Sequence, residues 1–255
     1  MEEKQLYFES HGTRLFAVES GAGKPLILLH GGLANYTACR VFAAPLDAEY
    51  RLVTPDLRAS GRSIFHGELT WDLIADDVAA LVGALGAERA IIGGTSGGAA
   101  AAVAAALKYP ALVEALLVLN PAYGGGELGL LPAQQMAMNA MDAAGSRAPT
   151  EGVDVLLPLF DALPEAIRER ARALVASYDA KSVAATTKFL ASAVQPFARA
   201  SDLTAITAPT LLVPGLDPYH PREVADVYAK HVPGVVVRDA APTDYAMVIA
   251  EFLAR

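Results

Sequence analysis

The chain has 255 residues, 53% of them hydrophobic, which is enough apolar material for one large domain with a substantial core. Its formal net charge of −8 and the absence of clustered lysine and arginine argue against a nucleic-acid partner. No apolar stretch is as long as a membrane-spanning helix, and the first residues lack a basic segment followed by an apolar block. We therefore expect no membrane partner and no secretory signal, and a cytoplasmic location is the default expectation.

Short apolar strands alternate with helical stretches through the first half of the chain. The segments 6–9 and 15–19 alternate across a turn and predict an edge hairpin. Apolar runs predict buried strands at 25–30, 50–56, 89–94 and 115–120, and apolar spacing predicts helices at 71–85 and 98–108. This order is typical of an α/β fold with a doubly wound, mainly parallel sheet.

The alternation stops between Tyr123 and Ser201. Three glycines are followed by helical material at 134–143, 164–177 and 181–193, without a convincing strand. The pattern then resumes with a strand at 210–213, a helix at 222–230, a strand at 235–238 and a helix at 244–253. We predict a core domain made of residues 1–122 and 202–255, with residues 123–201 inserted as a helical cap.

The segment Gly94-Thr95-Ser96-Gly97-Gly98 matches G-x-S-x-G between a predicted strand and a predicted helix. A serine on so sharp a turn projects its hydroxyl above the sheet, and the flanking glycines let strand and helix approach closely. The helix N-terminus also favours developing negative charge. The alternative interpretation is a glycine-rich turn that only packs tightly or cradles a phosphate.

A second motif, His30-Gly31-Gly32, closes the first buried strand. A main-chain N–H of Gly32, or of Leu33, could join that of Gly97 as an oxyanion hole. His30 itself is interpreted as a structural histidine that holds this loop. The segment 56–63 is interpreted as a structural turn network without a catalytic role.

Together these segments resemble the α/β-hydrolase superfamily, which includes esterase, lactonase and haloperoxidase-like members, over residues 6–253. The likeness lies in HGG at 30–32, PDLRASGRS at 55–63, GTSGG at 94–98, PTLLVPGLDPYHP at 209–221 and AEFL at 250–253. The resemblance implies that Ser96 is the nucleophile, that Asp217 is the acid and that the cap shapes the substrate pocket. For Asp217, the alternative is the turn residue of an Asp-Pro pair.

The family places its catalytic histidine in a loop after the last strand, and this sequence departs from that pattern. No histidine follows His231, and the segment between the last predicted strand and the last helix is short. We interpret the histidine loop as missing. Because an unactivated serine hydroxyl is a poor nucleophile, another group would have to act as the base.

Three replacements remain open. His220, three residues after Asp217, could approach Ser96 while Asp217 orients its ring, although a histidine before a proline at a helix start is often only a capping or packing residue. Asp239 or Asp244 could act as a weak base, although both are interpreted first as exposed or helix-capping carboxylates. Alternatively the protein hydrolyses nothing.

The first functional hypothesis is a serine-dependent hydrolase of a hydrophobic carboxylic ester, thioester or lactone that works through an acyl-enzyme. It assigns catalysis to Ser96, Asp217 and His220, and the oxyanion hole to Gly32 and Gly97. The second is a lyase, isomerase or cyclase on the same fold, and the third is a ligand-binding protein without turnover. The substrate class is predicted from apolar cap residues that would lie above Ser96. The alternative interpretation is that most of them form the cap's own core: Met136, Met138, Met141, Leu156, Leu157, Leu159, Phe160, Phe189 and Phe197.

No cofactor or metal is expected. Cys39 is the only cysteine and is interpreted as a small buried residue, and no paired histidine or cysteine spacing indicates zinc. The glycines around Ser96 form neither a dinucleotide fingerprint nor a P-loop. The expected partner is a small hydrophobic substrate with a carbonyl group, and a homodimer is an assembly left open.

Overall fold

The computed structural model describes the chain except for residues 1 and 162–164 and the side chains of residues 166 and 167. Its centre is an eight-stranded sheet in the order β1-β2-β4-β3-β5-β6-β7-β8. The strands are β1 Lys4–Ser10, β2 Thr13–Ser20, β3 Pro25–Leu29, β4 Arg51–Pro55, β5 Ala90–Ser96, β6 Val113–Pro121, β7 Thr210–Val213 and β8 Val236–Val237. Each of the eight overlaps a segment for which the sequence predicts a strand.

The sheet is mainly parallel. β1 and β2 form the predicted antiparallel hairpin at one edge, and β2 is also antiparallel to β4. Every later pair, from β4 with β3 to β7 with β8, is parallel. The carboxyl ends of these parallel strands therefore meet along one edge of the sheet, where doubly wound folds build their sites.

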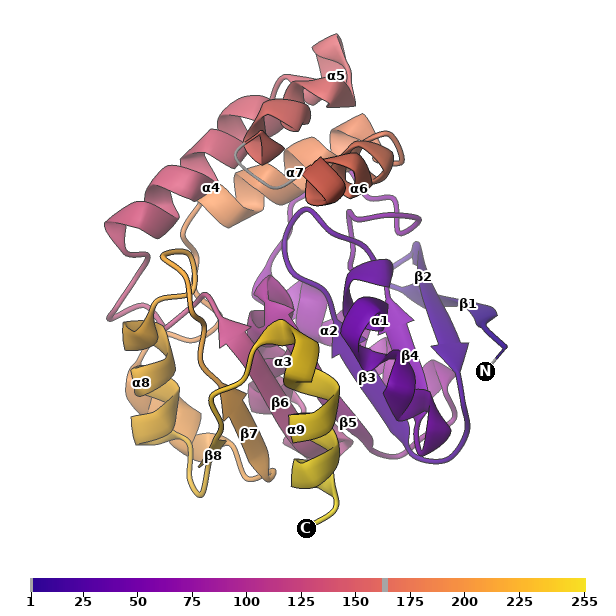
Figure 1. The fold of residues 1–255 in the computed structure, drawn as a ribbon, viewed down its shortest axis with the longest axis vertical. Coiled ribbons are helices and arrows are strands. Elements are labelled where there is room, and N and C mark those ends of the chain that lie inside the picture. The colour runs from indigo at the N-terminus through magenta and orange to yellow at the C-terminus, as the bar shows by residue number, and fades with distance from the viewer. Residues whose placement is uncertain (1, 162–164) are drawn as a thin grey trace.

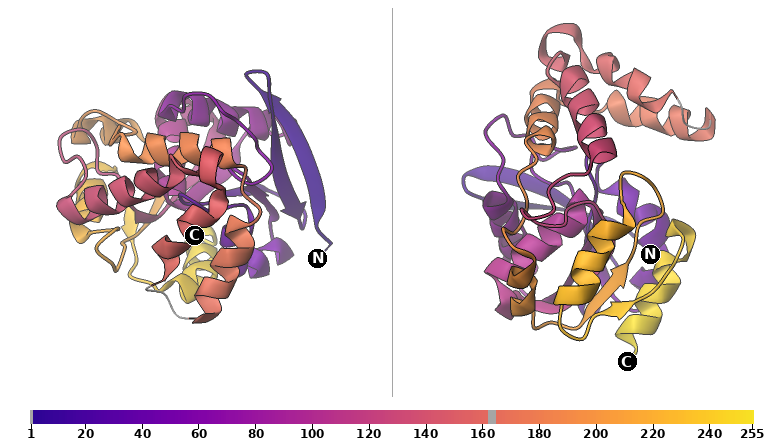
Figure 2. Two further views of the ribbon diagram at one scale, coloured as in Figure 1. Left: turned by 90° about the horizontal axis from the view of Figure 1, so that it is seen from above. Right: turned by 90° about the vertical axis from the view of Figure 1, so that its left-hand side faces the viewer.

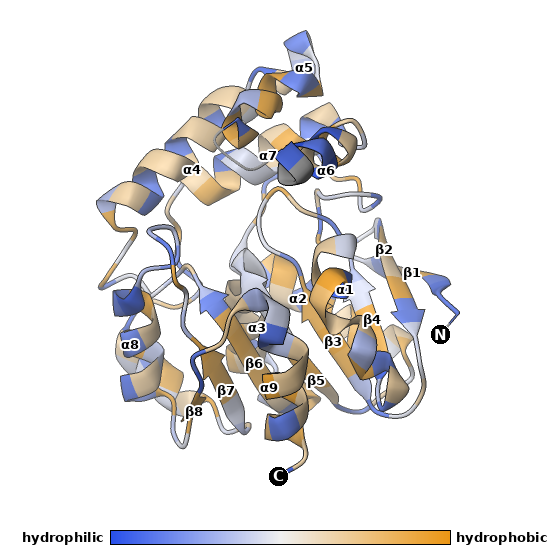
Figure 3. Ribbon diagram, viewed as in Figure 1, coloured by the Kyte–Doolittle hydropathy of each residue, from blue (hydrophilic) through white to orange (hydrophobic). Residues whose placement is uncertain are grey.

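Helices cover both faces of the sheet, as Figure 1 shows. The buried side chains of β3 alternate between two cores, with Ile27 and Leu29 in one and Leu26 and Leu28 in the other. The first core also contains side chains of α2 Trp71–Ala84, α3 Gly97–Lys108 and α8 Arg222–His231. The second contains those of α1 Thr37–Ala43 and α9 Tyr245–Leu253. The predicted doubly wound α/β fold is confirmed, and Figure 3 shows the hydrophobic colouring of the central strands between these helices.

The segment between β6 and β7 is helical. It contains α4 Pro132–Gly145, α5 Ala148–Glu151, the 3₁₀ helix η3 Val153–Phe160, α6 Glu165–Val175 and α7 Ala180–Ala191. The predicted helix at 164–177 includes Pro164, which lies outside the described residues. Figures 1 and 2 show α4 to α7 gathered over one end of the sheet, and we call α4 to α7 the helical insertion. The domain boundaries at 122/123 and 201/202 stay a prediction.

Short 3₁₀ helices link several of these elements: η1 Ala44–Ala48, η2 Pro110–Leu112, η4 Ala200–Ala205 and η5 Pro242–Asp244. Among the described helices, none combines the length and the apolar character that crossing a bilayer requires.

Candidate active site

Ser96 occupies a strained turn at the carboxyl end of β5. Its φ of 56° and ψ of −118° lie outside the usual regions for a residue with a side chain, and α3 begins at the next residue. A β-carbon on Gly98 would overlap the carbonyl group of Leu29, so only glycine fits there. Gly94 is restricted in the same way, because its β-carbon would lie 2.6 Å from the Leu29 oxygen. The sharp reversal predicted from G-x-S-x-G is therefore present, and the Ser96 side chain is half-buried.

The loop after β3 lies directly against this turn. A β-carbon on Gly31 would be 3.2 Å from Cβ of Ser96, and a β-carbon on Gly97 would be 3.6 Å from the main-chain nitrogen of Gly32. The backbones of Gly32 and Gly97 thus run side by side next to the serine. Main-chain N–H groups in such a position can stabilise an oxyanion if both point at the same spot.

His220 reaches Ser96 from the loop that follows β7. Its Nε2 lies 2.9 Å from Oγ of Ser96, and its Nδ1 lies 2.8 Å from Oδ2 and 3.0 Å from Oδ1 of Asp217. A carboxylate accepts hydrogen bonds, so Nδ1 carries the proton in this arrangement and Nε2 is left to accept from the serine hydroxyl. Serine, imidazole and carboxylate in this order are the arrangement in which an imidazole can act as the base for the hydroxyl proton.

The backbone of the His220 loop is folded around the Asp217 carboxylate. Oδ1 of Asp217 accepts hydrogen bonds from the main-chain nitrogens of Tyr219 at 2.8 Å and His220 at 3.1 Å. Asp217 therefore also has the turn role that the sequence left open. The imidazole side chain exposes 18% of its surface and the carboxylate exposes 48%, so the pair lies at the mouth of the site rather than in its interior.

Gln134, on α4, holds the same loop from the other side. Its side chain is fully buried, and its Nε2 donates to the carbonyl oxygens of Ala122 at 2.7 Å and Tyr219 at 2.9 Å. Its Oε1 accepts from the main-chain nitrogen of Leu131 at 3.0 Å. Sequence reasoning did not single out this residue, because a glutamine near the start of a helix reads as a local capping group until the distant carbonyl groups are known.

The two aspartates considered as substitute bases lie elsewhere. Asp239 is exposed and pairs with Arg222 at 3.3 Å, and Asp244 is exposed and accepts from the hydroxyl of Thr243 at 3.3 Å. Within the described residues, neither carboxylate has a hydrogen bond to Ser96 or His220. The structure brings His220, and not these aspartates, to the serine.

Both ring nitrogens of His30 form hydrogen bonds with main-chain groups, which agrees with its interpretation as a structural histidine. Its Nδ1 lies 2.7 Å from the carbonyl oxygen of Gly31, and its Nε2 accepts from the main-chain nitrogen of Leu57 at 3.0 Å. Burial lowers the pKa of the His30 imidazole below its usual value, which keeps the ring neutral. Nearby, burial raises the pKa of the Asp56 carboxyl, while hydrogen bonds from the main-chain nitrogens of Arg62 and Tyr36 oppose that rise.

Cys39 is interpreted as a small buried residue, and its thiol forms a hydrogen bond with Thr95, the residue before Ser96. It is fully buried on α1, in the core on the α9 side of the sheet, and burial raises the pKa of its thiol to about 12. A thiol with so high a pKa is a poor nucleophile near neutral pH.

A cavity of about 40 Å³ lies against the main chain of Gly31, Gly32 and Gly97. Its floor includes Arg58, and its walls include Trp71 and Phe189, whose rings pack edge to face with centroids 4.9 Å apart. A space of this size holds about one or two water molecules. We call it the inner cavity, and its apolar walls suit the reacting end of a small carbonyl compound better than a sugar ring.

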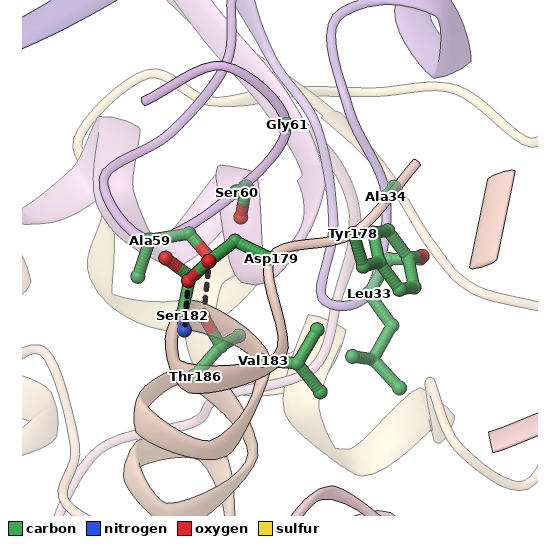
Figure 4. Close-up of a pocket in the computed structure, with 10 residues that line it drawn as sticks. All are labelled: Leu33, Ala34, Ala59, Ser60, Gly61, Tyr178, Asp179, Ser182, Val183 and Thr186. Atoms are coloured by element: carbon green, nitrogen blue, oxygen red, sulfur yellow. Dashed lines mark hydrogen bonds between the residues drawn. The ribbon is translucent and has the colours of Figure 1, made fainter. Parts of the chain in front are cut away.

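The helical insertion closes one side of the inner cavity. Leu190 of α7 sits so close to Gly32 that a β-carbon there would lie 2.7 Å from Cδ1 of the leucine. Thr186, also on α7, donates a hydrogen bond to the carbonyl oxygen of Ala59 at 3.0 Å. Tyr178, just before α7, donates one to the carbonyl oxygen of Leu33. Figure 4 shows Thr186 and Tyr178 at a small pocket that is also lined by the loops carrying Leu33 and Ala59.

The apolar side chains between residues 123 and 201, from which the substrate class was predicted, lie in several different environments. Phe189 lines the inner cavity, and Leu156 belongs to a separate core of the insertion, against which Phe160 packs. Met138 and Phe197 are buried in the core on the α3 side of the sheet, and Met136 is 69% exposed. The alternative interpretation, that most of these residues form the insertion's own packing, agrees with the structure for the leucines and Phe160.

Over the part of the chain that the structure describes, no cluster of three or more histidine, cysteine, aspartate or glutamate side chains could hold a metal ion.

Comparison with solved structures gives full-length matches. A thermophilic esterase from Thermogutta terrifontis has a TM-score of 0.78 at 25% identity, with 98% of each chain covered. An esterase from Exiguobacterium antarcticum has a TM-score of 0.82 at 17% identity, with 98% of this chain and 99% of the other covered. At that lower identity the likeness shows the fold alone.

Curated relatives match over shorter stretches. A proline iminopeptidase from Xanthomonas citri is 38% identical over 103 residues, which are 39% of this chain and 30% of the relative. A 2-hydroxy-6-oxononadienedioate/2-hydroxy-6-oxononatrienedioate hydrolase from Paraburkholderia phymatum is 36% identical over 152 residues, 56% of this chain and 46% of the relative. The matched stretches thus span 30% and 46% of these two relatives.

The family model for the alpha/beta hydrolase fold matches residues 24–246, which include β3, the Ser96 turn, the helical insertion and the His220 loop. The chain therefore belongs to the α/β-hydrolase fold family.

Proposed function

We propose that this protein is a serine hydrolase of small hydrophobic carboxylic esters, thioesters or lactones, acting through an acyl-enzyme. The observation that carries the proposal is the continuous contact from Ser96 through His220 to Asp217, with 2.9 Å and 2.8 Å between the successive atoms. The hydrolase names of the relatives support the reaction class, and the apolar inner cavity supports the substrate class.

In the proposed mechanism, Oγ of Ser96 attacks the substrate carbonyl carbon while Nε2 of His220 takes the hydroxyl proton. Asp217 orients the imidazole and stabilises its charged form through Nδ1. The negative charge that develops on the carbonyl oxygen is held by the main-chain N–H groups of Gly32 and Gly97. The proton on His220 then passes to the leaving oxygen or sulfur, and water releases the acyl group by the same steps.

The base comes from the loop after β7, instead of the loop after β8. This placement needs aspartate and histidine in one tight turn, because the acid and the base are only three residues apart. It explains how a chain without a histidine after His231 could still activate its serine. The proposal therefore depends on His220 far more than on any other histidine of the chain.

A fluorophosphonate probe read out by mass spectrometry tests the proposal. We expect rapid labelling at Ser96, no labelling of Ser96→Ala, and a labelling rate at least about a hundredfold lower in His220→Ala, because a positioned general base contributes roughly 10²–10⁴-fold. The matched control is His231→Ala, at the end of α8, which should label like the parent protein.

Equal labelling of His220→Ala and the parent would remove His220 from the mechanism. Absence of labelling in the folded parent, together with no turnover of 4-nitrophenyl esters, would contradict the serine hydrolase and favour a non-hydrolytic catalyst or a binding protein.

A further inference from the structure

A second, larger hollow lies outside the inner cavity and shares part of its wall. This outer groove has a volume of about 610 Å³ and runs between α7, the segment 66–70 and Val194. Leu69 and Phe189 line both the outer groove and the inner cavity. The two hollows are therefore adjacent, with Leu69 and Phe189 in contact with both.

One face of α7 forms the wall of this groove. The lining residues Lys181, Ala184, Ala185, Lys188 and Ser192 follow the spacing of one helix face. The two lysines are seven residues apart, or about 10 Å along the helix axis, and the alanines leave room between them. The opposite face of α7 carries Val183 and Leu190 into the protein interior, so the helix fixes which side chains face the groove.

Two lysines and one glutamate line the groove, although the whole chain carries a net charge of −8. Lys181 and Lys188 are exposed, and among the described residues neither has an ion pair with a carboxylate. Glu68 is the acidic residue of the lining. His66 also lines the groove, and its Nε2 lies 2.7 Å from Oδ1 of Asp179.

We propose that the outer groove binds a carboxylate at the far end of the substrate's acyl chain, so that the preferred substrates are monoesters, thioesters or lactones of dicarboxylic acids. This inference rests on the proposed serine hydrolase. The apolar part of the acyl chain passes Leu69 and Phe189, and the terminal carboxylate pairs with Lys181 or Lys188. Exposed lysines attract such a group by charge without demanding one fixed geometry.

The test compares two esters of equal chain length, 4-nitrophenyl octanoate and the mono-4-nitrophenyl ester of suberic acid. The quantity is the ratio of kcat/KM for the suberate ester to that for the octanoate ester. We expect Lys181→Ala or Lys188→Ala to lower this ratio roughly twofold to fivefold, and the double change to glutamate to lower it about tenfold or more. Glu68→Gln should raise it, and added salt should reduce the difference between parent and variants.

The matched control is Lys4→Glu/Lys230→Glu, which changes the net charge equally on β1 and α8 and should leave the ratio unchanged. If the parent hydrolyses both esters and the ratio is the same in the groove variants, the carboxylate site is wrong and the serine hydrolase stands. An equal loss of preference in the control variant also overturns the site, because a general field would then explain it. If Ser96 takes no probe and neither ester turns over, the hydrolase itself fails, and the groove inference fails with it.

Discussion

The side-chain amide of Gln134 and the main-chain carbonyl of Tyr219 are joined by a hydrogen bond of 2.9 Å, which ties α4 to the loop that carries His220. The same Nε2 also donates to Ala122, directly after β6. One buried side chain thus connects the helical insertion, the central sheet and the residue next to the proposed base. We regard Gln134 as a positioning residue for His220.

We expect Gln134→Leu to lower both stability and turnover. The change removes the donor from the buried carbonyl oxygen of Ala122 and from the partly buried one of Tyr219, and a buried group that stays unsatisfied costs roughly 1–3 kcal/mol. Released from α4, the Tyr219 carbonyl no longer fixes the distance between His220 and Ser96, so kcat should fall more than KM changes. Urea unfolding and ester kinetics measure the two effects.

Gln135→Leu is the matched control, since its partly exposed amide donates to Asn139 on the same helix and to Ala191 on α7, and, within the described part of the chain, to no residue of the His220 loop. An unchanged kcat in Gln134→Leu with a clear loss of stability would show that Gln134 only supports the fold.

Gly215 sets the path of the His220 loop at its start. A β-carbon at this position would overlap both Cβ and the carbonyl oxygen of His220. Gly215→Ala must therefore displace the histidine, and we expect at least a tenfold loss of ester turnover because small misplacements of a catalytic group are costly.

Gly83→Ala is the matched control, because it makes the same chemical change where the added methyl group meets no neighbouring atom of the described residues. Gly83 lies near the end of α2, and nothing lies within 4 Å of the position its β-carbon would take. We expect this variant to be more stable by about 0.5–1 kcal/mol with unchanged turnover. Equal turnover of Gly215→Ala and Gly83→Ala would contradict the tight packing around His220.

The sequence predicts the fold well because its signals are local. Buried strands such as Pro25–Leu29 are continuous apolar runs. The helix after Thr70 is capped by the Thr70 hydroxyl, which accepts a hydrogen bond from the main-chain nitrogen of Leu73 at 3.1 Å. Element ends are less sharp: the last strand is predicted over four residues and contains two, Val236 and Val237. The short edge strand pairs on one side only, so apolar character overestimates its length.

The candidate site was only partly predictable. Ser96 and Gly97 follow from G-x-S-x-G, because strain, glycines and hydroxyl lie within five residues. His220 stayed one of three options, because sequence distance does not tell which loop reaches across from β7 to β5. Gln134 and Leu190 were missed, since their partners Tyr219 and Gly32 are far away in the chain and only the packing of the helical insertion brings them together.

His30 should make stability depend on pH. Burial lowers the pKa of its imidazole in the folded state, whereas the unfolded chain keeps the ordinary value near 6.5. Below about pH 6.5 the unfolded state binds more protons, so the free energy of unfolding falls as pH decreases, by up to about 1.4 kcal/mol per pH unit for one group. His30→Gln cannot be protonated and should lose less stability between pH 7.5 and pH 5.5.

The measurement is urea unfolding of both proteins at the two pH values. The quantity compared is the change in the free energy of unfolding between pH 7.5 and pH 5.5 in each protein. The hydrogen bonds that the variant lacks are missing at both pH values, so their contribution cancels. The same decrease in both proteins would show that His30 is not the group that titrates.

Arg58 and Asp77 form a buried ion pair beneath the inner cavity. The guanidinium donates to both carboxylate oxygens, at 2.6 Å and 2.9 Å, and to the carbonyl oxygen of Ser10 at 2.9 Å. The arginine side chain has no exposed surface and that of the aspartate exposes 7%. The pair thus joins β1, α2 and the loop after β4, and it supports the cavity floor to which Arg58 contributes.

We expect Asp77→Leu to reduce the free energy of unfolding by roughly 3–5 kcal/mol, because it leaves a buried guanidinium without its counter-charge. The double variant Arg58→Met/Asp77→Leu should recover a large part of that loss, since it removes both charges and keeps apolar volume in the floor. Unfolding in urea gives the stabilities, and the coupling free energy follows from the cycle completed by Arg58→Met. A double variant as unstable as the sum of the single variants would mean that each residue acts through other contacts, such as those of Arg58 with Ser10, and not through the pair. Because neither side chain touches Ser96 or His220, we expect the double variant to keep a measurable rate of fluorophosphonate labelling wherever it remains folded.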